Sequence, residues 1–89
     1  MSLPPDQPIA ETAPTAAKVT DYDRTHMTTY LRLLDAASED APWEEVARVV
    51  LGLDPTQAPD RVRRIHDTHL ARARWLTEQG YRDLLRASR

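Results

Sequence analysis

Apolar residues recur at a helical spacing in three segments of this chain, and nowhere do they alternate with polar residues as in a half-buried strand. Residues at i, i+3, i+4 and i+7 lie on one side of an α-helix. The three sets are Met27, Tyr30, Leu31 and Leu34; Trp43, Val46, Ala47 and Val50; and Val62, Ile65, His66, His69, Ala73 and Leu76. The pattern predicts an all-α fold, a small bundle of three main helices followed by a short C-terminal helix.

Capping and helix-breaking residues set the expected helix boundaries. Thr20 or Asp21 suits the cap of the first helix, and Pro42 suits the first position of the second. Gly52 and Gly80 are expected to stop the second and third helices. The predicted helices cover residues 22–37, the stretch from Pro42 to just before Gly52, residues 59–79, and residues 81–85.

The chain has 89 residues, which is enough for one domain. Residues 1–20 contain four prolines and few core-forming side chains, so we expect a disordered tail, either idle or ordered by a partner. Residues 21–89 are expected to form a helical domain. The absence of cysteine excludes disulfides and thiolate chemistry. The sequence shows neither a secretory signal nor an apolar run of the roughly 20 residues that a membrane helix needs, so we expect a cytoplasmic protein.

Charge is divided unevenly along the helical part of the chain. Residues 21–60 hold nine acidic side chains and three arginines, a charge of −6, whereas residues 61–89 hold three acidic side chains and eight arginines, a charge of +5. A basic segment attracts phosphates or an acidic partner. It could equally pair with the acidic half of its own chain, and the sequence leaves both interpretations open.

The third predicted helix separates into faces when its residues are placed at 100° intervals. One face carries both histidines among apolar residues and is expected to form the core side. A second line is expected to face outward, and we take it as a candidate partner-binding stripe. This outer stripe consists of Arg61, Arg64, Thr68, Arg72, Trp75 and Gln79. Arginine and tryptophan are enriched at interface hot spots. The other interpretation is that Trp75 is covered by the last helix or the tail, which would leave the arginines solvated.

No catalytic or metal-binding constellation is recognisable in the sequence. His66 and His69 lie three residues apart, but a zinc site needs three or four ligands and no further ligands occur at a recognisable spacing. No nucleophile, acid/base pair or glycine-rich phosphate loop is present. We therefore expect neither an enzyme nor a protein with a cofactor, a metal or a small-molecule substrate.

The second and third predicted helices resemble a helix-turn-helix, although their linker of about six residues (53–58) is longer than usual. The DNA-reading end of such a motif would here carry Asp60, Arg61, Arg63 and Arg64. Nearby acidic residues and a charge of −1 over residues 21–89 argue against a broad basic footprint. This reasoning favours contact with protein partners and predicts weak or no DNA binding. A DNA-binding regulator is the alternative.

Two stretches resemble a proteobacterial family of variant helix-turn-helix proteins from integrative and conjugative elements, formerly a domain of unknown function. They are WEEVARVVLG at residues 43–52 and RIHDTHLARARWLTEQGYRDLL at residues 64–85. The resemblance, which spans residues 22–85, is strongest to short antiactivators of the QseM type. It implies a protein that binds transcriptional activators, quorum-sensing TraR-like and FseA-like proteins, and so inhibits excision and conjugative transfer of the element. The alternative it leaves is a DNA-binding transcriptional regulator or activator subunit.

Overall fold

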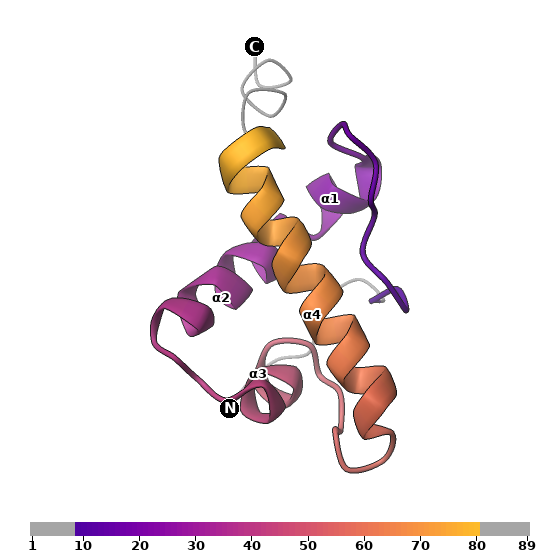
Figure 1. Ribbon diagram of the computed structural model, residues 1–89, viewed down its shortest axis with the longest axis vertical. Helices are drawn as coiled ribbons and strands as arrows, with labels where there is room; N and C mark the ends of the chain where they lie inside the picture. The colour runs from indigo at the N-terminus through magenta and orange to yellow at the C-terminus, as the bar shows by residue number, and fades with distance from the viewer. Residues whose placement is uncertain (1–8, 81–89) are drawn as a thin grey trace.

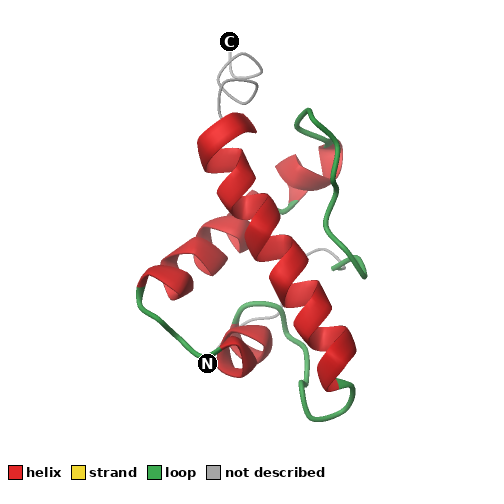
Figure 2. Ribbon diagram, in the orientation of Figure 1, coloured by secondary structure: helices red, strands yellow, loops and turns green. Residues whose placement is uncertain are grey.

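The computed structural model describes residues 9–80, which form helices joined by loops, with no strand among them (Figure 1 and Figure 2). The all-α prediction is therefore confirmed. The elements are α1 (Asp21–Thr25), α2 (Met27–Ser38), α3 (Trp43–Val49), α4 (Pro59–Trp75) and a π-helical turn, η1 (Leu76–Gly80). The short helix predicted over 81–85 lies outside the described residues.

The first predicted helix is divided into α1 and α2 at His26, which has φ −104° and ψ 20°. A capping box starts α1, because Thr20 Oγ1 accepts the Asp23 N–H while the Asp23 carboxylate accepts the Thr20 N–H. The His26 N–H is shared between the carbonyls of Tyr22 and Asp23, and its ring Nδ1 also donates to the Tyr22 carbonyl. These contacts end α1 at His26, and α2 begins at the next residue, Met27.

The remaining boundaries lie close to the predicted ones. Pro42 caps α3 from an extended conformation, so it stands one residue before the helix and not at its first position. Gly52 follows α3 with φ 68°, a left-handed conformation that glycine adopts without steric cost. Pro59 opens α4, as expected, and the helical path continues beyond Trp75 as the π-helical turn to Gly80.

The core lies where α4 crosses α2 and α3 (Figure 1). Tyr30 and Leu33 of α2 and Ile65 of α4 are each 1% exposed. The buried cluster consists of Val19, Tyr30, Leu33, Val46, Val50, Leu51, Ile65, Ala73 and Leu76. The predicted core face of the third helix is therefore confirmed, and it includes both histidines, since His66 and His69 are buried. No helix within residues 9–80 is long and apolar enough to cross a membrane.

The N-terminal segment, defined here as residues 9–20, lies beside α4 and runs in the same direction (Figure 1). Ala13 and Val19 are buried, and side chains of α4 hold the backbone between them. Disorder of a tail over residues 1–20 stays a prediction. In the structure, side chains of α4 supply partners for backbone polar groups of residues 9–20, and composition alone does not reveal these contacts. Residues 1–8 lie outside the described part of the chain.

Candidate functional site

The outer stripe of α4 lies beneath and beside the N-terminal segment. Arg61, Thr68 and Arg72 each bond to that segment, at Glu11, at Ala13, and at Ala16 and Lys18 respectively. Trp75 is half-buried against Arg72, and Arg64 and Gln79 are exposed. Gln79 lies in η1 rather than in α4, and Arg72 is buried, so its expected outward position is wrong. Much of the stripe already contacts the protein's own chain.

Arg61 and Glu11 form a two-pronged ion pair at the start of α4. Arg61 Nε donates to both Glu11 carboxylate oxygens at 2.9 Å, and Nη2 donates to Oε1 at 2.6 Å. The hydrogen bond from Arg61 is the main cause that lowers the pKa of Glu11; desolvation acts in the opposite direction, and the positive charges of Arg61 and Arg64 lower the pKa further. Both side chains remain more than half exposed, at 52% and 61%, so water and salt screen the pair.

Thr68 and Tyr22 hold the outer part of the N-terminal segment by its backbone. The Ala13 N–H donates to Thr68 Oγ1 at 3.2 Å, and Thr68 in turn donates to the Ile65 carbonyl of its own helix. The Ala10 N–H donates to the Tyr22 hydroxyl at 2.9 Å. Residues 10–13 are therefore held by two backbone bonds, one exposed ion pair and the buried methyl group of Ala13.

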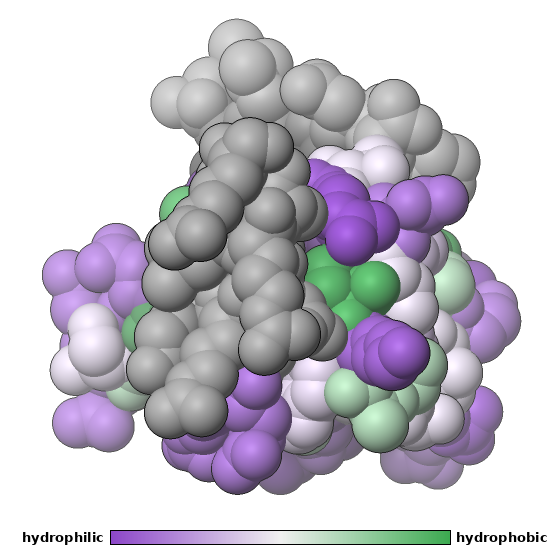
Figure 3. All heavy atoms as spheres, turned by 90° about the horizontal axis from the view of Figure 1, so that it is seen from above, coloured by the Kyte–Doolittle hydropathy of each residue, from purple (hydrophilic) through white to green (hydrophobic). Residues whose placement is uncertain are grey.

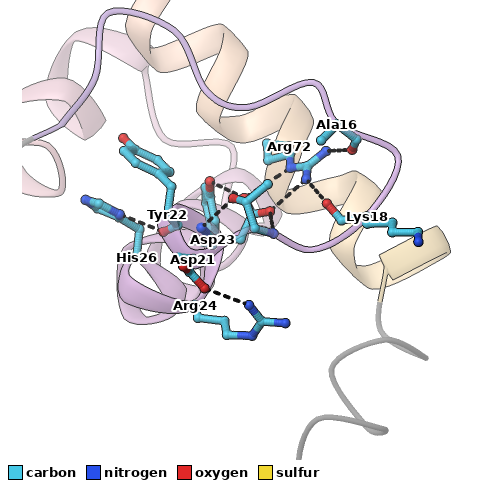
Figure 4. A network of polar contacts seen from close by, with 10 residues as sticks. Ala16, Lys18, Asp21, Tyr22, Asp23, Arg24, His26 and Arg72 are labelled. Atoms are coloured by element: carbon cyan, nitrogen blue, oxygen red, sulfur yellow. Dashed lines mark hydrogen bonds and ion pairs between the residues drawn. The ribbon is translucent and has the colours of Figure 1, made fainter.

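Arg72 joins the inner part of the N-terminal segment to α1 (Figure 4). Its guanidinium donates to both Asp23 carboxylate oxygens, at 3.1 and 2.7 Å, and to the carbonyls of Ala16 and Lys18, at 2.6 and 3.0 Å. It also lies 4.1 Å from the centroid of the Trp75 ring. Arg72 is only 5% exposed, so its guanidinium is occupied within the fold.

Asp23 is the buried counterpart of Arg72. Besides the two bonds from Arg72, its carboxylate accepts the Tyr30 hydroxyl at 2.9 Å and the Thr20 N–H at 2.9 Å. Burial disfavours the charged carboxylate, but these hydrogen bonds outweigh it and hold the pKa of Asp23 below its ordinary value. The Thr20–Asp23 spacing is a capping signal in the sequence. No sequence signal pairs Asp23 with an arginine so distant along the chain.

His69 belongs to a polar chain within the core and not to a ligand set. Its Nδ1 donates to the Ile65 carbonyl at 2.7 Å, so in the neutral ring Nε2 accepts the Tyr22 hydroxyl proton across 2.6 Å. Burial is the main cause that lowers the pKa of His69. The ring of His26 stacks on Tyr22 with centroids 3.9 Å apart. Within residues 9–80, no three histidine or acidic side chains are placed to hold a metal ion.

The exposed arginines at the start of α4 form the remaining candidate surface. Arg61, Arg63 and Arg64 are all exposed within its first two turns. Arg63 lies 5.1 Å from the Trp43 ring centroid and pairs at 3.3 Å with Asp67, four residues further along α4. The shallow depression beside this end of α4 is lined by Trp43, Glu44, Arg48, Pro55, Thr56 and Pro59. Arg48 of α3 lines this depression together with Pro59, so it lies at the same end of the molecule as the start of α4.

A comparison with protein-family models gives one match, to a T6SS transcription-factor DNA-binding domain (the RovC DNA-binding domain), over residues 6–86. No curated protein matches the chain. The matched range includes the N-terminal segment and every helix described here. The match is to a DNA-binding domain and not to an enzyme class.

The comparison overturns one prediction and favours another. The expectation of weak or no DNA binding is wrong, because the matching family is a DNA-binding domain. The match supports the DNA-binding alternative over the antiactivator, and gives no link to QseM-type proteins, quorum sensing or conjugative elements. Net charge is a poor guide here because it sums charges over the whole domain. The exposed arginines Arg61, Arg63 and Arg64 lie together at the start of α4, whatever the charge elsewhere.

Proposed function

Since the chain belongs to the family of T6SS transcription-factor DNA-binding domains, we propose that it binds duplex DNA as the DNA-reading part of a transcription regulator. The helix that would enter the major groove is α4. The observation that carries this assignment is the set of three exposed arginines, Arg61, Arg63 and Arg64, in the first two turns of α4. In a helix-turn-helix, residues at this end of the second helix reach the base edges.

The order and packing of the helices support the assignment. α3 precedes α4, and both pack into one core with α2, as in a three-helix DNA-binding unit (Figure 2). α4 is the longest helix of the described residues, at 17 residues, and its exposed side projects away from that core. An arginine fork can donate to O6 and N7 of guanine or to a phosphate.

The three arginines differ in whether they form an ion pair within the fold. Arg63 is paired with Asp67, and Arg61 with Glu11. Arg64 has no ion-pair partner among residues 9–80, and its side chain is exposed. We therefore assign base reading to Arg64 and phosphate contact to Arg61 and to Arg48 of α3.

The test is selection of a binding site from a random duplex pool, followed by titration of the labelled duplex at several salt concentrations. Arg64→Ala should weaken binding by about 1–3 kcal/mol and relax the preference at one base position. Arg61→Ala should weaken binding to all sequences and lower the salt slope by about one. Arg24→Ala is the matched control, because Arg24 is exposed on α1, away from α4 in sequence, and its ion pair within residues 9–80 is with Asp21.

Two results would overturn this function. One is failure of the wild-type protein to enrich or bind any duplex at physiological salt. The other is equal weakening by Arg24→Ala and Arg64→Ala, which would show that only overall charge matters. Circular dichroism of each variant establishes that helicity is retained.

A further inference from the structure

The N-terminal segment covers part of the surface that the proposed function assigns to DNA. The Glu11 carboxylate of that segment accepts three hydrogen bonds from Arg61. We propose that residues 9–13 form an autoinhibitory cover in which the Glu11 carboxylate occupies the phosphate-binding fork of Arg61, and that DNA displaces it. This inference rests on the proposed function and adds a regulatory step to the same surface.

The geometry of the pair carries the proposal. A carboxylate and a phosphate each present two oxygens that an arginine fork can bind through parallel N–H donors. Arg61 uses Nε and Nη2 for Glu11, and these are the donors it would offer a phosphate. Glu11 and a DNA phosphate therefore cannot both hold this fork. Arg64 lies close enough for its charge to act on Glu11, so displacement of Glu11 also removes a negative charge near the proposed base reader.

The two halves of the N-terminal segment are held very differently, which allows one to open without the other. The inner half is fixed by the buried side chain of Val19, by two backbone bonds to Arg72, and by the Thr20 cap of α1. The outer half is held by the solvated Glu11–Arg61 pair, by the exposed bond from Ala10, by Ala13, and by Ile9, which is partly buried against the core cluster. Pro14, between the two halves, has no N–H that release would leave without a partner. Release of residues 9–13 would thus expose the Ile9 side chain but leave the buried cluster itself in place.

The cover also fits the surface chemistry of the molecule. Seen from above, the visible described surface is mostly hydrophilic or intermediate, with a hydrophobic patch near its centre (Figure 3). The contacts of residues 10–11 with the rest of the protein are polar and exposed. A polyanion such as DNA competes with such contacts through its phosphates. An apolar partner would have no comparable means of displacing Glu11.

A double-mutant cycle on the full chain tests the cover. Glu11→Gln should tighten binding of the selected duplex by about fivefold, the order expected for loss of one exposed ion pair. In the Arg61→Gln background, the same change should have little effect, because the fork is already gone. Glu78→Gln is the matched control: Glu78 is exposed in η1 at the far end of the helical path, and its replacement makes the same change in charge.

Amide hydrogen exchange gives a second, independent measurement. The duplex should speed exchange at Ala10 and Ala13, whose N–H groups bond to Tyr22 and Thr68. Exchange at Thr20, which is bonded to Asp23, should not change. Glu11→Gln alone should speed exchange at Ala10 and Ala13 without DNA.

The possible outcomes separate the two proposals. If duplex binds but Glu11→Gln tightens it equally with and without Arg61, or if DNA slows exchange at Ala13, the cover is wrong and the DNA-binding function stands. If no variant binds any duplex, the proposed function fails and the cover fails with it. Tightening that needs Arg61, together with faster exchange at Ala13, supports both.

Discussion

Arg72 and Asp23 are the two residues on which the N-terminal half of the structure depends. Their ion pair is almost wholly buried, and Arg72 also bonds to two backbone carbonyls of the N-terminal segment. Removing one member of a buried pair leaves an uncompensated charge in the core, which costs about 3–5 kcal/mol. A lysine has no planar fork with which to reach both Asp23 oxygens and both carbonyls together.

We therefore expect Arg72→Ala to lower the free energy of unfolding by about 3–5 kcal/mol. Arg72→Lys should recover only part of that loss. Arg74→Lys is the matched control, because Arg74 is exposed two residues away on the same helix. Urea unfolding followed by circular dichroism measures all three. A stability within about 0.5 kcal/mol of wild type for Arg72→Lys, the range of ordinary surface substitutions, would contradict this role.

The lowered pKa of His69 leads us to expect that the protein loses stability in mild acid. Burial, followed by the charge of His26, lowers the pKa of His69 from its ordinary value of 6.5, whereas the Ile65 bond and Asp23 act in the opposite direction. The unfolded chain therefore binds the proton more readily than the folded chain. The stabilisation is fully present above about pH 6.5 and is lost as the pH falls through that value toward the folded pKa.

The measurement is the free energy of unfolding at pH 7.5 and at pH 5.5. Wild-type protein should be less stable at the lower pH, because the protonated ring would no longer accept the Tyr22 hydroxyl. His69→Gln should be less stable than wild type at pH 7.5, but it should lose less between the two conditions. An equal loss in both proteins would place the acid sensitivity elsewhere.

At the scale of elements, the sequence located the helices wherever one apolar side was to be buried by a neighbour. The core sides of α3 and α4 follow the predicted spacing, and Gly52 and Pro59 lie where their backbone preferences place them. The stripe predicted for α2 is wrong in part, because Leu31 is 59% exposed whereas Leu33, which was not in the stripe, is buried. The break at His26 and the docking of residues 9–20 could not be found this way. Both depend on contacts between distant segments, above all those of Arg72, and hydrophobic periodicity records no such contact. The outer stripe stays a prediction as a partner-binding surface, and one of its members, Arg72, is buried rather than outward-facing.

The start of α4 offers a stabilising change. Its N-cap is Ala58, whose side chain cannot accept a hydrogen bond from the first turn. Ala58→Ser should supply that acceptor and raise the free energy of unfolding by about 1 kcal/mol, or the melting temperature by roughly 4–8 °C. Ala71→Ser, at an exposed position inside α4, is the control and should lower stability slightly. If both serine variants change the free energy of unfolding by the same amount, the missing N-cap hydrogen bond does not limit the stability of α4.

At the scale of the whole molecule, the N-terminal segment has two parts with different relations to the core. The inner part completes the fold, since Val19 belongs to the buried cluster and Thr20 caps α1. The outer part lies over the start of α4, where DNA binding is proposed. The same segment therefore contributes to the stability of the domain and also controls whether DNA can reach the proposed interface. The boundary between its two parts falls near Pro14.

Truncation from the N-terminus should reveal that boundary as two distinct effects. A chain lacking residues 1–13 should unfold cooperatively and lose about 2–3 kcal/mol, because it gives up the exposed Glu11 pair, two backbone bonds, one buried methyl group and the partly buried Ile9 side chain. A chain lacking residues 1–19 also loses the buried Val19 and both carbonyl partners of Arg72. That loss of several kcal/mol approaches the whole stability of a small domain.

The first chain should bind duplex more tightly than the full chain, and the second should be largely unfolded by circular dichroism. Equal stability of the two chains would show that residues 14–19 do not complete the core, whatever their effect on DNA.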